Sequence, residues 1–295
     1  MLVVGDVVTD VVARHAEPLA ADTDTAARIA VRPGGAGANV ACWAARCGAR
    51  VRLLGRVGAD SADWHRAELR AAGVDPVLRI DQDLPTAVVI ALVDAAAERT
   101  LVTDSGAAFQ LGPADWAEEL LDGSARVHLS GYLFFSPPGR ELAAVVAKSA
   151  RARGLPVSVD PASAGFLRQF GVPGFLDAVS GTDLLLPNEA EAALLSGQAE
   201  PAEAARELSA RCGGAEVVVT LGAGGALAAV GGRVVARAPA VAAGAVDSTG
   251  AGDAFTGGLL AARLAGADLP TALATGCRAG AAAVTTVGGR PPKAG

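Results

Sequence analysis

The sequence predicts an α/β fold with a mostly parallel sheet that helices cover on both faces. Along most of the 295 residues, short runs rich in valine and leucine alternate with alanine-rich amphipathic segments. Strands that alternate with helices in this way are typical of a parallel sheet, because each crossover helix packs against one face of it. Hydrophobic residues make up 51% of the chain and charged residues 19%, which is the composition of a globular protein and not of a disordered one.

The expected elements follow this alternation from the first strand to the last helix. Each expected strand is a short apolar run: Leu2–Val8, Val51–Val57, Arg126–Leu129, Pro156–Asp160, Leu184–Leu186 and Glu216–Leu221. Each expected helix has apolar residues at helical spacing: Ala36–Cys47, Ser61–Ala72, Gly139–Arg153, Glu189–Leu195, Ala202–Cys212, Asp253–Leu264 and Pro270–Thr286. Gly48 and Gly73 mark the ends of the first two helices, since glycine is common just past a helix. A ligand is expected beyond the carboxyl ends of the strands, where such sheets bind ligands.

Two β-rich segments interrupt the alternation. Thr86–Val93 and Arg99–Asp104 are separated by a polar turn and are expected to form a hairpin, with Ala26–Arg32 as a further strand nearby. A few strands without helices cannot form a core of their own. We therefore expect a single domain over residues 1–295, with a small β lid inserted as segments of about 10–32 and 86–104.

Several classes of protein are disfavoured. The net charge is −6 and no basic patch stands out, so nucleic acid is not an expected partner. The opening run Leu2–Val12 contains Asp6 and Asp10 and lacks a basic start, so it is expected to be a buried strand and not a signal peptide. No apolar stretch is long enough to span a bilayer, so a cytoplasmic location without a membrane partner is expected. The three histidines are scattered without metal-ligand spacing.

The most informative segment is Asp247-Ser248-Thr249-Gly250-Ala251-Gly252-Asp253. Asp247 is expected to end a strand, and the small residues Gly250–Gly252 to turn sharply into the helix that starts at Asp253. Amide groups at a helix N-terminus attract anions, and a phosphoryl group in transfer spreads negative charge over its oxygens. A carboxylate beside that anion site is placed to accept a proton from an attacking hydroxyl. For an isolated turn of this kind, a helix cap and a simple bend are the commoner explanation.

This segment resembles the C-terminal signature D-T-x-G-A-G-D of the PfkB carbohydrate kinase family, also called ribokinase-like; Ser248 replaces the commoner threonine. Four other segments resemble family motifs and occur in the family's order: Gly5–Asp10, Gly34–Asn39, Pro187–Glu191 and Thr220–Gly225. The resemblance covers nearly the whole chain. It implies a three-layer α/β/α sandwich with a central, mostly parallel sheet and a small β-sheet lid. It also implies a kinase that uses ATP and Mg²⁺.

The resemblance assigns roles to individual residues. Asp253 is the expected catalytic base, and the amides of Gly250, Ala251 and Gly252 are the expected anion hole. Substrate contacts are expected from these residues: Asp10, Gly34, Gly35, Asn39, Asp253 and, from the lid, Arg99. ATP contacts are expected from these: Asn188, Thr220, Gly222 and Gly225. Glu191 and Asn188 are expected to hold Mg²⁺ through water, and Asp247, Thr249 and Gly289 to bind a monovalent cation such as K⁺.

Plain structural explanations stay open for several of these residues. Asn188 and Glu191 have the spacing of a helix capping box. Residues 220–225 have the composition of a hairpin turn, and Asp10 suits the cap of a turn. An arginine on an exposed hairpin such as Arg99 is more often only a solvated charge.

The sequence also departs from the ribokinase branch. Val8 and Ala36 stand where that branch carries Asn and Lys, and no acid appears at Ser130-Gly131-Tyr132, where some relatives hold a sugar-side glutamate. Ribose is therefore in doubt as the substrate, and a less polar pocket suits a nucleoside.

The function expected from these motifs is ATP-dependent phosphorylation of a hydroxyl group, a primary CH₂OH, on a small sugar or nucleoside. A homodimer through the lid is expected, as in many relatives. The first alternative is a catalytically silent sensor of a sugar or nucleotide with the same fold. A Rossmann oxidoreductase is the second; it is disfavoured because the glycine loop at 34–39 does not directly follow the first strand.

Overall fold

The fold is seen in a computed structural model that describes residues 1–95 and 99–292. Within these residues, nine strands form the main sheet in the order β13-β12-β11-β10-β9-β8-β1-β4-β5. Their bounds are Arg233–Ala238 (β13), Ala226–Val230 (β12), Glu216–Thr220 (β11), Leu184–Leu185 (β10), Val157–Asp160 (β9), Val127–Ser130 (β8), Leu2–Val4 (β1), Val51–Gly58 (β4) and Val74–Asp81 (β5). The pairs from β11 to β5 are parallel, whereas β12 and β13 are added antiparallel at one edge.

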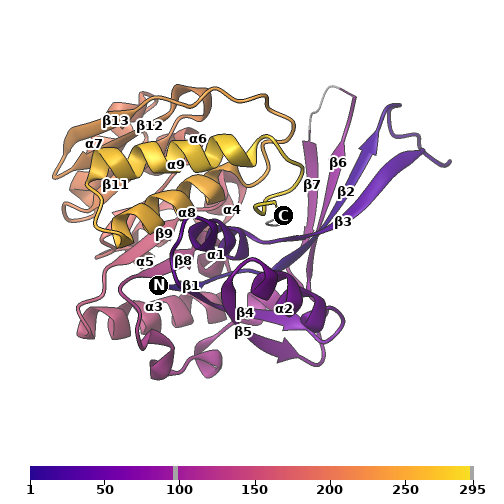
Figure 1. Cartoon of the computed structure of the whole chain (residues 1–295), viewed down its shortest axis with the longest axis horizontal. Helices are drawn as coiled ribbons and strands as arrows, with labels where there is room; N and C mark the ends of the chain where they lie inside the picture. The colour runs from indigo at the N-terminus through magenta and orange to yellow at the C-terminus, as the bar shows by residue number, and fades with distance from the viewer. Residues whose placement is uncertain (96–98, 293–295) are drawn as a thin grey trace.

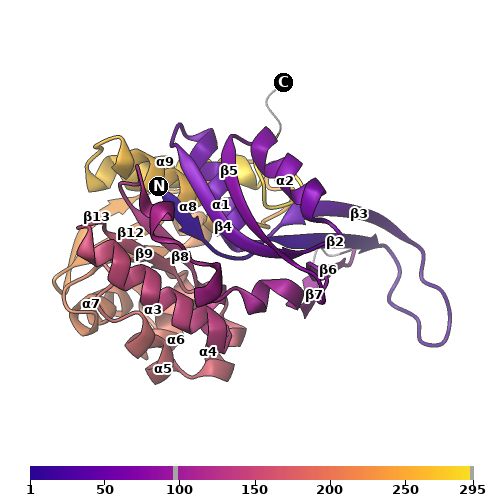
Figure 2. The same ribbon diagram turned by 90° about the horizontal axis from the view of Figure 1, so that it is seen from below.

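Helices cover both faces of the main sheet, as Figures 1 and 2 show. One face carries α1 (Ala36–Arg46), α2 (Ala62–Ala71), α8 (Ala251–Leu264) and α9 (Leu269–Ala283). The other face carries α3 (Pro137–Ala152), α4 (Ala164–Phe170), α5 (Val172–Ala178), α6 (Glu189–Ser196) and α7 (Pro201–Arg211). Short 3₁₀ turns occupy Gly106–Gln110, Pro113–Asp115, Glu118–Leu121, Gly131–Phe135 and Gly222–Gly224. None of the helices in the described residues is both long and apolar enough to span a bilayer.

The side chains of β1 explain why the central strands are apolar at every position. Leu2 and Val4 pack into the core under the α3–α7 layer, while Val3 packs into the core under α1 and α8. All three residues are fully buried. Strands covered on both faces read as continuous apolar runs and not as alternating ones, so the expected three-layer α/β fold is confirmed.

Four further strands form a small sheet in the order β3-β2-β6-β7 within the described residues. They are β2 (Val8–His15), β3 (Ala27–Gly34), β6 (Ala87–Val93) and β7 (Arg99–Asp104). The small sheet projects from the body of the molecule (Figure 1), and no helix of the described residues packs on it as a layer.

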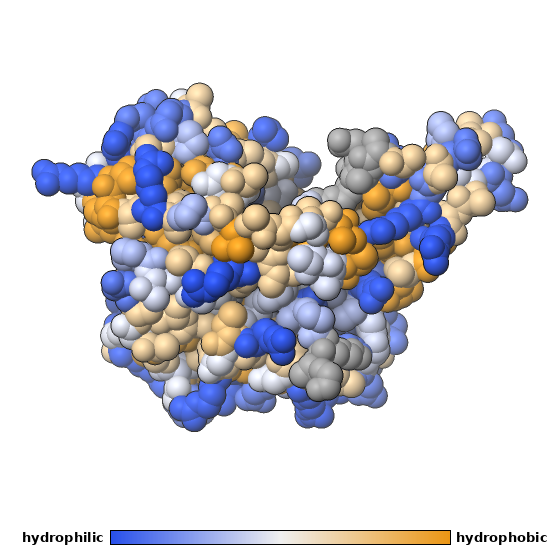
Figure 3. Space-filling model, turned by 45° about the horizontal axis from the view of Figure 1, so that its top comes forward, coloured by the Kyte–Doolittle hydropathy of each residue, from blue (hydrophilic) through white to orange (hydrophobic). Residues whose placement is uncertain are grey.

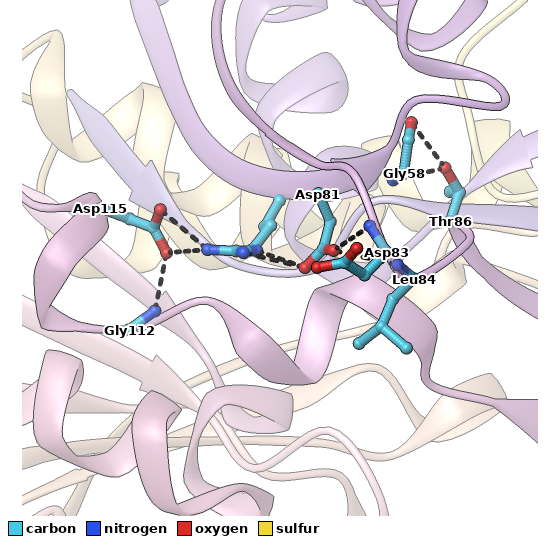
Figure 4. A network of polar contacts seen from close by, with 8 residues as sticks. Gly58, Asp81, Asp83, Leu84, Thr86, Gly112 and Asp115 are labelled. Carbon is cyan, nitrogen blue, oxygen red and sulfur yellow. Dashed lines mark hydrogen bonds and ion pairs between the residues drawn. The ribbon is translucent and has the colours of Figure 1, made fainter.

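A network of polar contacts fixes the base of the small sheet, as Figure 4 shows. Thr86, which precedes β6, is buried; its Oγ1 accepts from the amide of Gly58 (2.9 Å) and its own amide donates to Asp60 (2.9 Å). Asp81 accepts from the amides of residues 83 and 84 at 3.0 Å each and pairs with Arg56 at 2.8 Å. These contacts join the end of β5 and the turn before β6 to the body.

The structure differs from the sequence-based expectation in three places. The strand expected at 2–8 is divided, because the chain leaves the main sheet after Val4 and enters the small sheet at Val8. A Cβ on Gly5 would lie only 2.7 Å from that of Ser130, so the crossing point is tightly packed. Asp247 does not end a strand: residues 239–248 form a loop. Strands β5, β12 and β13 and helices α4 and α5 were absent from the expectation.

Candidate active site

A cavity of about 280 Å³ lies between the body and the small sheet. It borders residues that follow the carboxyl ends of β1, β8, β9 and β10, the place where ligands bind in parallel sheets. Five carboxylates from distant parts of the chain line it: Asp6, Asp10, Asp160, Glu191 and Asp253. A larger cavity of about 740 Å³ lies between α1, α2 and residues 285–292, and of the residues expected in the site it contains only Gly289.

Asp253 lies in the first turn of α8 and lines the cavity. Its Oδ2 accepts a hydrogen bond from Nδ2 of Asn39 in α1 at 2.8 Å. The two helices approach closely here, since a Cβ on Gly257 would lie 2.8 Å from the amide nitrogen of Ala44. The Oδ1 of Asn39 is buried and has no hydrogen-bond partner among the described residues.

Burial controls the electrostatics of the cavity. Burial raises the pKa of Asp253 well above its usual value, the hydrogen bond from Asn39 opposes this, and the nearby Asp160, Asp6 and Asp10 raise it further. Burial likewise raises the pKa of Asp10 to about 6 and that of Asp160 to about 6. The pKa of Glu191 is raised to about 8 by burial and by Asp160. Carboxylates this close together favour a bound cation or a proton among them.

The N-terminus of α8 faces the cavity through Gly252. Gly250 precedes the helix with a left-handed backbone (φ 73°), which glycine adopts without strain. The amide of Ala251 donates to the Ser248 carbonyl at 3.3 Å, while the amides of Gly250 and Gly252 have no acceptor in the described part of the chain. Open space lies beyond Gly252, since a Cβ placed there meets nothing within 4 Å. An anion can therefore approach these amides.

A second contact joins this turn to the loop after α9. The Asp247 carboxylate accepts from the amide and hydroxyl of Thr249 (3.0 and 2.7 Å) and from the amide of Gly288 (3.0 Å). Gly250 packs directly on Gly289. Asp247, Thr249 and Gly289 are thus brought together, although no group of three or more His, Cys, Asp or Glu side chains suited to a metal occurs in the described residues.

Asn188 and Glu191 form a reciprocal capping box at the start of α6. The Glu191 amide donates to Asn188 Oδ1, and the Asn188 amide donates to Glu191 Oε2, both at 2.9 Å. Both residues also line the cavity, as does Thr220, which pairs with Asn188 across the end of β11. Capping thus leaves both residues in contact with the cavity.

The glycine turn after β11 lies outside the cavity. Gly222 and Gly225 connect β11 to β12, where the Leu221 amide donates to the Gly225 carbonyl at 2.8 Å. Gly225 has φ 88° and approaches Pro239 closely. This segment is therefore a turn of the hairpin between β11 and β12, as the plain structural interpretation predicted.

The substrate-side motifs meet at the base of the small sheet. Asp10, on β2, lines the cavity together with Gly35, while Gly34 packs directly against the Asp10 carboxylate. Gly35 has φ 94° and precedes α1. The side chain of Arg99 lies outside the described residues.

Four residues of the site went unrecognised in the sequence. Asp6 accepts from the amides of Ala36 and Gly37, and Asp160 is the last residue of β9 and accepts from Thr256 Oγ1 at 3.4 Å. Tyr132 lines the cavity just after β8. Arg290 donates to the Gly34 carbonyl at 3.1 Å. An acid at the carboxyl end of an expected strand, such as Asp160, is a signal that could have been used. The contact of Arg290 has no counterpart in any local pattern.

Comparisons with known proteins agree with this geometry. Residues 1–294 match the model of the pfkB family carbohydrate kinases. A fructokinase from Klebsiella pneumoniae is 33% identical over 280 residues, which span 92% of this chain and 86% of the relative. The structure of adenosine kinase from Sinorhizobium meliloti aligns with a TM-score of 0.89 at 25% identity and covers 98% of this chain and 95% of its own.

A protein from E. coli described as a ribokinase II was solved in complex with ATP and Mg²⁺; it aligns with a TM-score of 0.85 at 26% identity. This alignment covers 98% of the present chain and 93% of the relative. The fold, the order of the motifs and these relatives agree over almost the full length. The chain belongs to the pfkB family of carbohydrate kinases and is an ATP-dependent sugar or nucleoside kinase.

Proposed function

We propose that this kinase transfers a phosphoryl group from ATP to a primary hydroxyl of a small sugar or nucleoside, with Asp253 as the catalytic base. The observation that carries the proposal is the placement of this carboxylate at the N-terminus of α8, inside the cavity and bonded to Asn39. An attacking hydroxyl bonded to Asp253 gives up its proton as its oxygen bonds to phosphorus. The raised pKa makes the ionised carboxylate a stronger base, and the Asn39 amide orients it.

In this proposal the turn at 250–252 stabilises the transferred phosphoryl group. Its charge spreads over three oxygens in the transition state, and amide donors at a helix N-terminus suit such a species. The amides of Gly250 and Gly252 have no acceptor in the described residues, so they support the assignment more strongly than the Ala251 amide, which already donates to the Ser248 carbonyl.

We propose that ATP contacts Asn188, Thr220, Gly222 and Gly225, with Mg²⁺ held through water by Glu191 and Asn188. The carboxylates at Glu191 and Asp160 fit a hard cation, which prefers oxygen ligands and keeps much of its water. When bound, Mg²⁺ neutralises charge on the phosphates. A monovalent cation beside Asp247, Thr249 and Gly289 is a further part of the proposal. Since ATP is the donor, we also propose a cytoplasmic location.

The acceptor is proposed to bind between Asp10, Gly34, Gly35, Asn39 and Asp253, with the small sheet as a lid on a single domain. Arg99 remains a proposed contact from the lid. Glycines allow the acceptor to approach the backbone, and Asp10 accepts hydrogen bonds from its hydroxyl groups.

The outer face of the small sheet supports a homodimer. The paired residues Val11 and Val31, and likewise Ile90 and Val102, place apolar side chains on the face opposite the cavity. Val31 and Val102 are 58% and 54% exposed. A contiguous apolar patch of this kind marks an interaction surface, and we propose that a second copy covers it.

The test of the catalytic assignment is the Asp253→Asn variant. It keeps the size of the side chain but cannot accept the proton, so we expect kcat to fall by about two orders of magnitude or more. Steady-state ADP release measures kcat, and circular dichroism and thermal unfolding establish that the variant folds. Asp268→Asn is the matched control, because Asp268 caps α9 on the surface and asparagine caps equally well.

A folded Asp253→Asn variant with a normal kcat would refute the assignment. If the wild-type protein binds sugars or nucleosides without releasing ADP, the catalytically silent sensor is the better description.

A further inference from the structure

The cavity has two unlike halves. Its polar half, at the body, holds the carboxylates and Asn39. Its other half is formed by the small sheet, whose cavity-facing side chains are almost all apolar: Val8, Val12, Ala87, Val89, Ala91 and Leu101. Strand register explains why they share one face, since Val12 pairs with Ala91 and Ala91 with Leu101. A ligand that fills both halves is polar at one end and apolar at the other.

Leu101 shows that the apolar half is open to a ligand. This side chain borders the cavity and is 60% exposed. In the described residues, the small sheet offers only Asp10 and Thr103 as polar side chains to the cavity. Hydroxyl groups buried against this face lack hydrogen-bond partners, which is unfavourable. A free hexose, with hydroxyls around its whole ring, therefore suits this half poorly.

An aromatic wall closes the cavity beside the small sheet. Phe109 and Tyr132 both line the cavity, and both pack edge-to-face on Phe166, with ring centroids 6.2 and 5.7 Å away. A third ring thus holds both side chains in place. Fixed aromatic rings provide a large apolar surface for a flat ring system.

The charged side chains of the cavity disfavour another class of acceptor. Five carboxylates line it, and no Lys, Arg or His is among the described residues that do so. A phosphorylated sugar brings its own negative charge and finds no cation there to pair with. The described lining of the cavity therefore favours an uncharged acceptor.

We propose that the acceptor is a nucleoside, with its sugar between Asp10, Asn39 and Asp253 and its base between Phe109 and the apolar face of the small sheet. This inference rests on the proposed function, because it assumes that the acceptor hydroxyl lies at Asp253. The base then covers the exposed Leu101 and the aromatic wall, and Asp10 and Asp253 meet the hydroxyl groups of the sugar.

The test compares ADP release with four acceptor classes at matched concentrations. The panel holds the common nucleosides, free ribose, the hexoses fructose and glucose, and fructose 6-phosphate. Stacking of a base on an aromatic side chain is expected to raise kcat/KM for the best nucleoside by about tenfold or more over free ribose. The phosphorylated sugar is expected to be the poorest acceptor.

A pair of variants locates the effect. Phe109→Leu is expected to lower kcat/KM for the best nucleoside by about fivefold to tenfold while free ribose is unaffected, since it removes aromatic stacking alone. Phe170→Leu is the matched control: this phenylalanine belongs to the same aromatic cluster but does not line the cavity. This control is expected to leave kcat/KM unchanged for both the best nucleoside and free ribose.

The outcomes separate this inference from the proposed function. A sugar or sugar phosphate preferred over every nucleoside overturns the nucleoside assignment and leaves the kinase mechanism intact. An equal loss for all acceptors in Phe109→Leu also overturns it. If no acceptor yields ADP, the proposed function fails. Calorimetric titration with the same nucleosides and with ribose then tests the base contact alone. Equal affinities for the nucleosides and for ribose would overturn the inference.

Discussion

Arg290 is the residue that sequence reasoning had least reason to choose. Its Nη2 donates to the Gly34 carbonyl, while its Nε and Nη1 are buried without a partner among the described residues. Its positive charge lowers the pKa of Asp10, against the effect of burial. Arg290 therefore supports Gly34 and Asp10, the two groups proposed to contact the acceptor, and only the folded chain brings residues 34 and 290 together.

Replacement of this arginine is expected to weaken acceptor binding. In Arg290→Met the KM for the acceptor should rise about tenfold, because one charged hydrogen bond and the partner charge of Asp10 are lost. The KM for ATP and kcat should change much less, which a general loss of structure would not produce. Arg278→Met is the control, because Arg278 is exposed on α9 and donates a hydrogen bond to Thr275. A rise in both KM values together would contradict a positioning role.

The motif residues themselves were recognisable because their chemistry is local. The Gly250–Asp253 turn and the Gly34–Asn39 loop each combine small residues with one polar side chain over a few positions. Their meeting in space is not local: the Asn39–Asp253 hydrogen bond joins positions 214 residues apart. These two segments could thus be recognised in the sequence, whereas the contact between them could not.

Among the elements, α6 performs two tasks with the same two side chains. Asn188 and Glu191 satisfy the first amides of the helix and also face the cavity. Glu191 is nevertheless buried among like charges, and this burial raises its pKa. A folded-state pKa above the unfolded value means that the free energy of unfolding falls as pH rises from about 4.5 to about 8.

Glu191→Gln should separate these tasks. Glutamine can complete a capping box and carries no charge. In Mg²⁺-free buffer above the pKa of Glu191, we therefore expect the variant to have a higher free energy of unfolding than the wild type. Activity with Mg²⁺ should fall, because a carboxylate near the cation is lost. Denaturant titration and ADP release measure the two effects. Glu203→Gln, at the third position of α7, is the control and should alter neither. A variant that is both less stable and fully active would contradict the argument.

Some strands could be predicted from their composition and others could not. Central strands such as β1 are apolar throughout because both faces are covered, so the sequence predicted them. The edge strand β5 contains Asp75, Pro76 and Arg79, which are common on edges but weaken the strand pattern. The break at Gly5 escaped prediction because it depends on the packing of Ser130 from a distant segment.

At the scale of the whole molecule, the small sheet has two apolar faces. One borders the cavity, and the other presents Val11, Val31, Ile90 and Val102 to the outside. Figure 3 shows hydrophobic residues gathered on this part of the molecule, apart from those of the body. Apolar side chains exposed on the face of a small sheet without a covering helix favour a second chain as its cover.

Val31→Glu is expected to abolish this association. A charge in the centre of an apolar interface is unfavourable when unpaired, so light scattering should give the mass of two chains for the wild type and of one chain for the variant. Val235→Glu is the control, because Val235 is 53% exposed on β13, at the far edge of the main sheet. A monomeric wild type, or a variant that still dimerises, would contradict the proposed interface.

The division of the chain after Val4 has one more consequence. Asp10 belongs to the small sheet, whereas Asn39 and Asp253 belong to helices of the body, and only residues 5–7 separate β1 from β2. An acceptor that reaches all three side chains therefore ties the two parts of the molecule together. A water molecule is too small to bond to Asp10, Asn39 and Asp253 at once, so under the proposed mechanism we expect ATP hydrolysis without an acceptor to be slow.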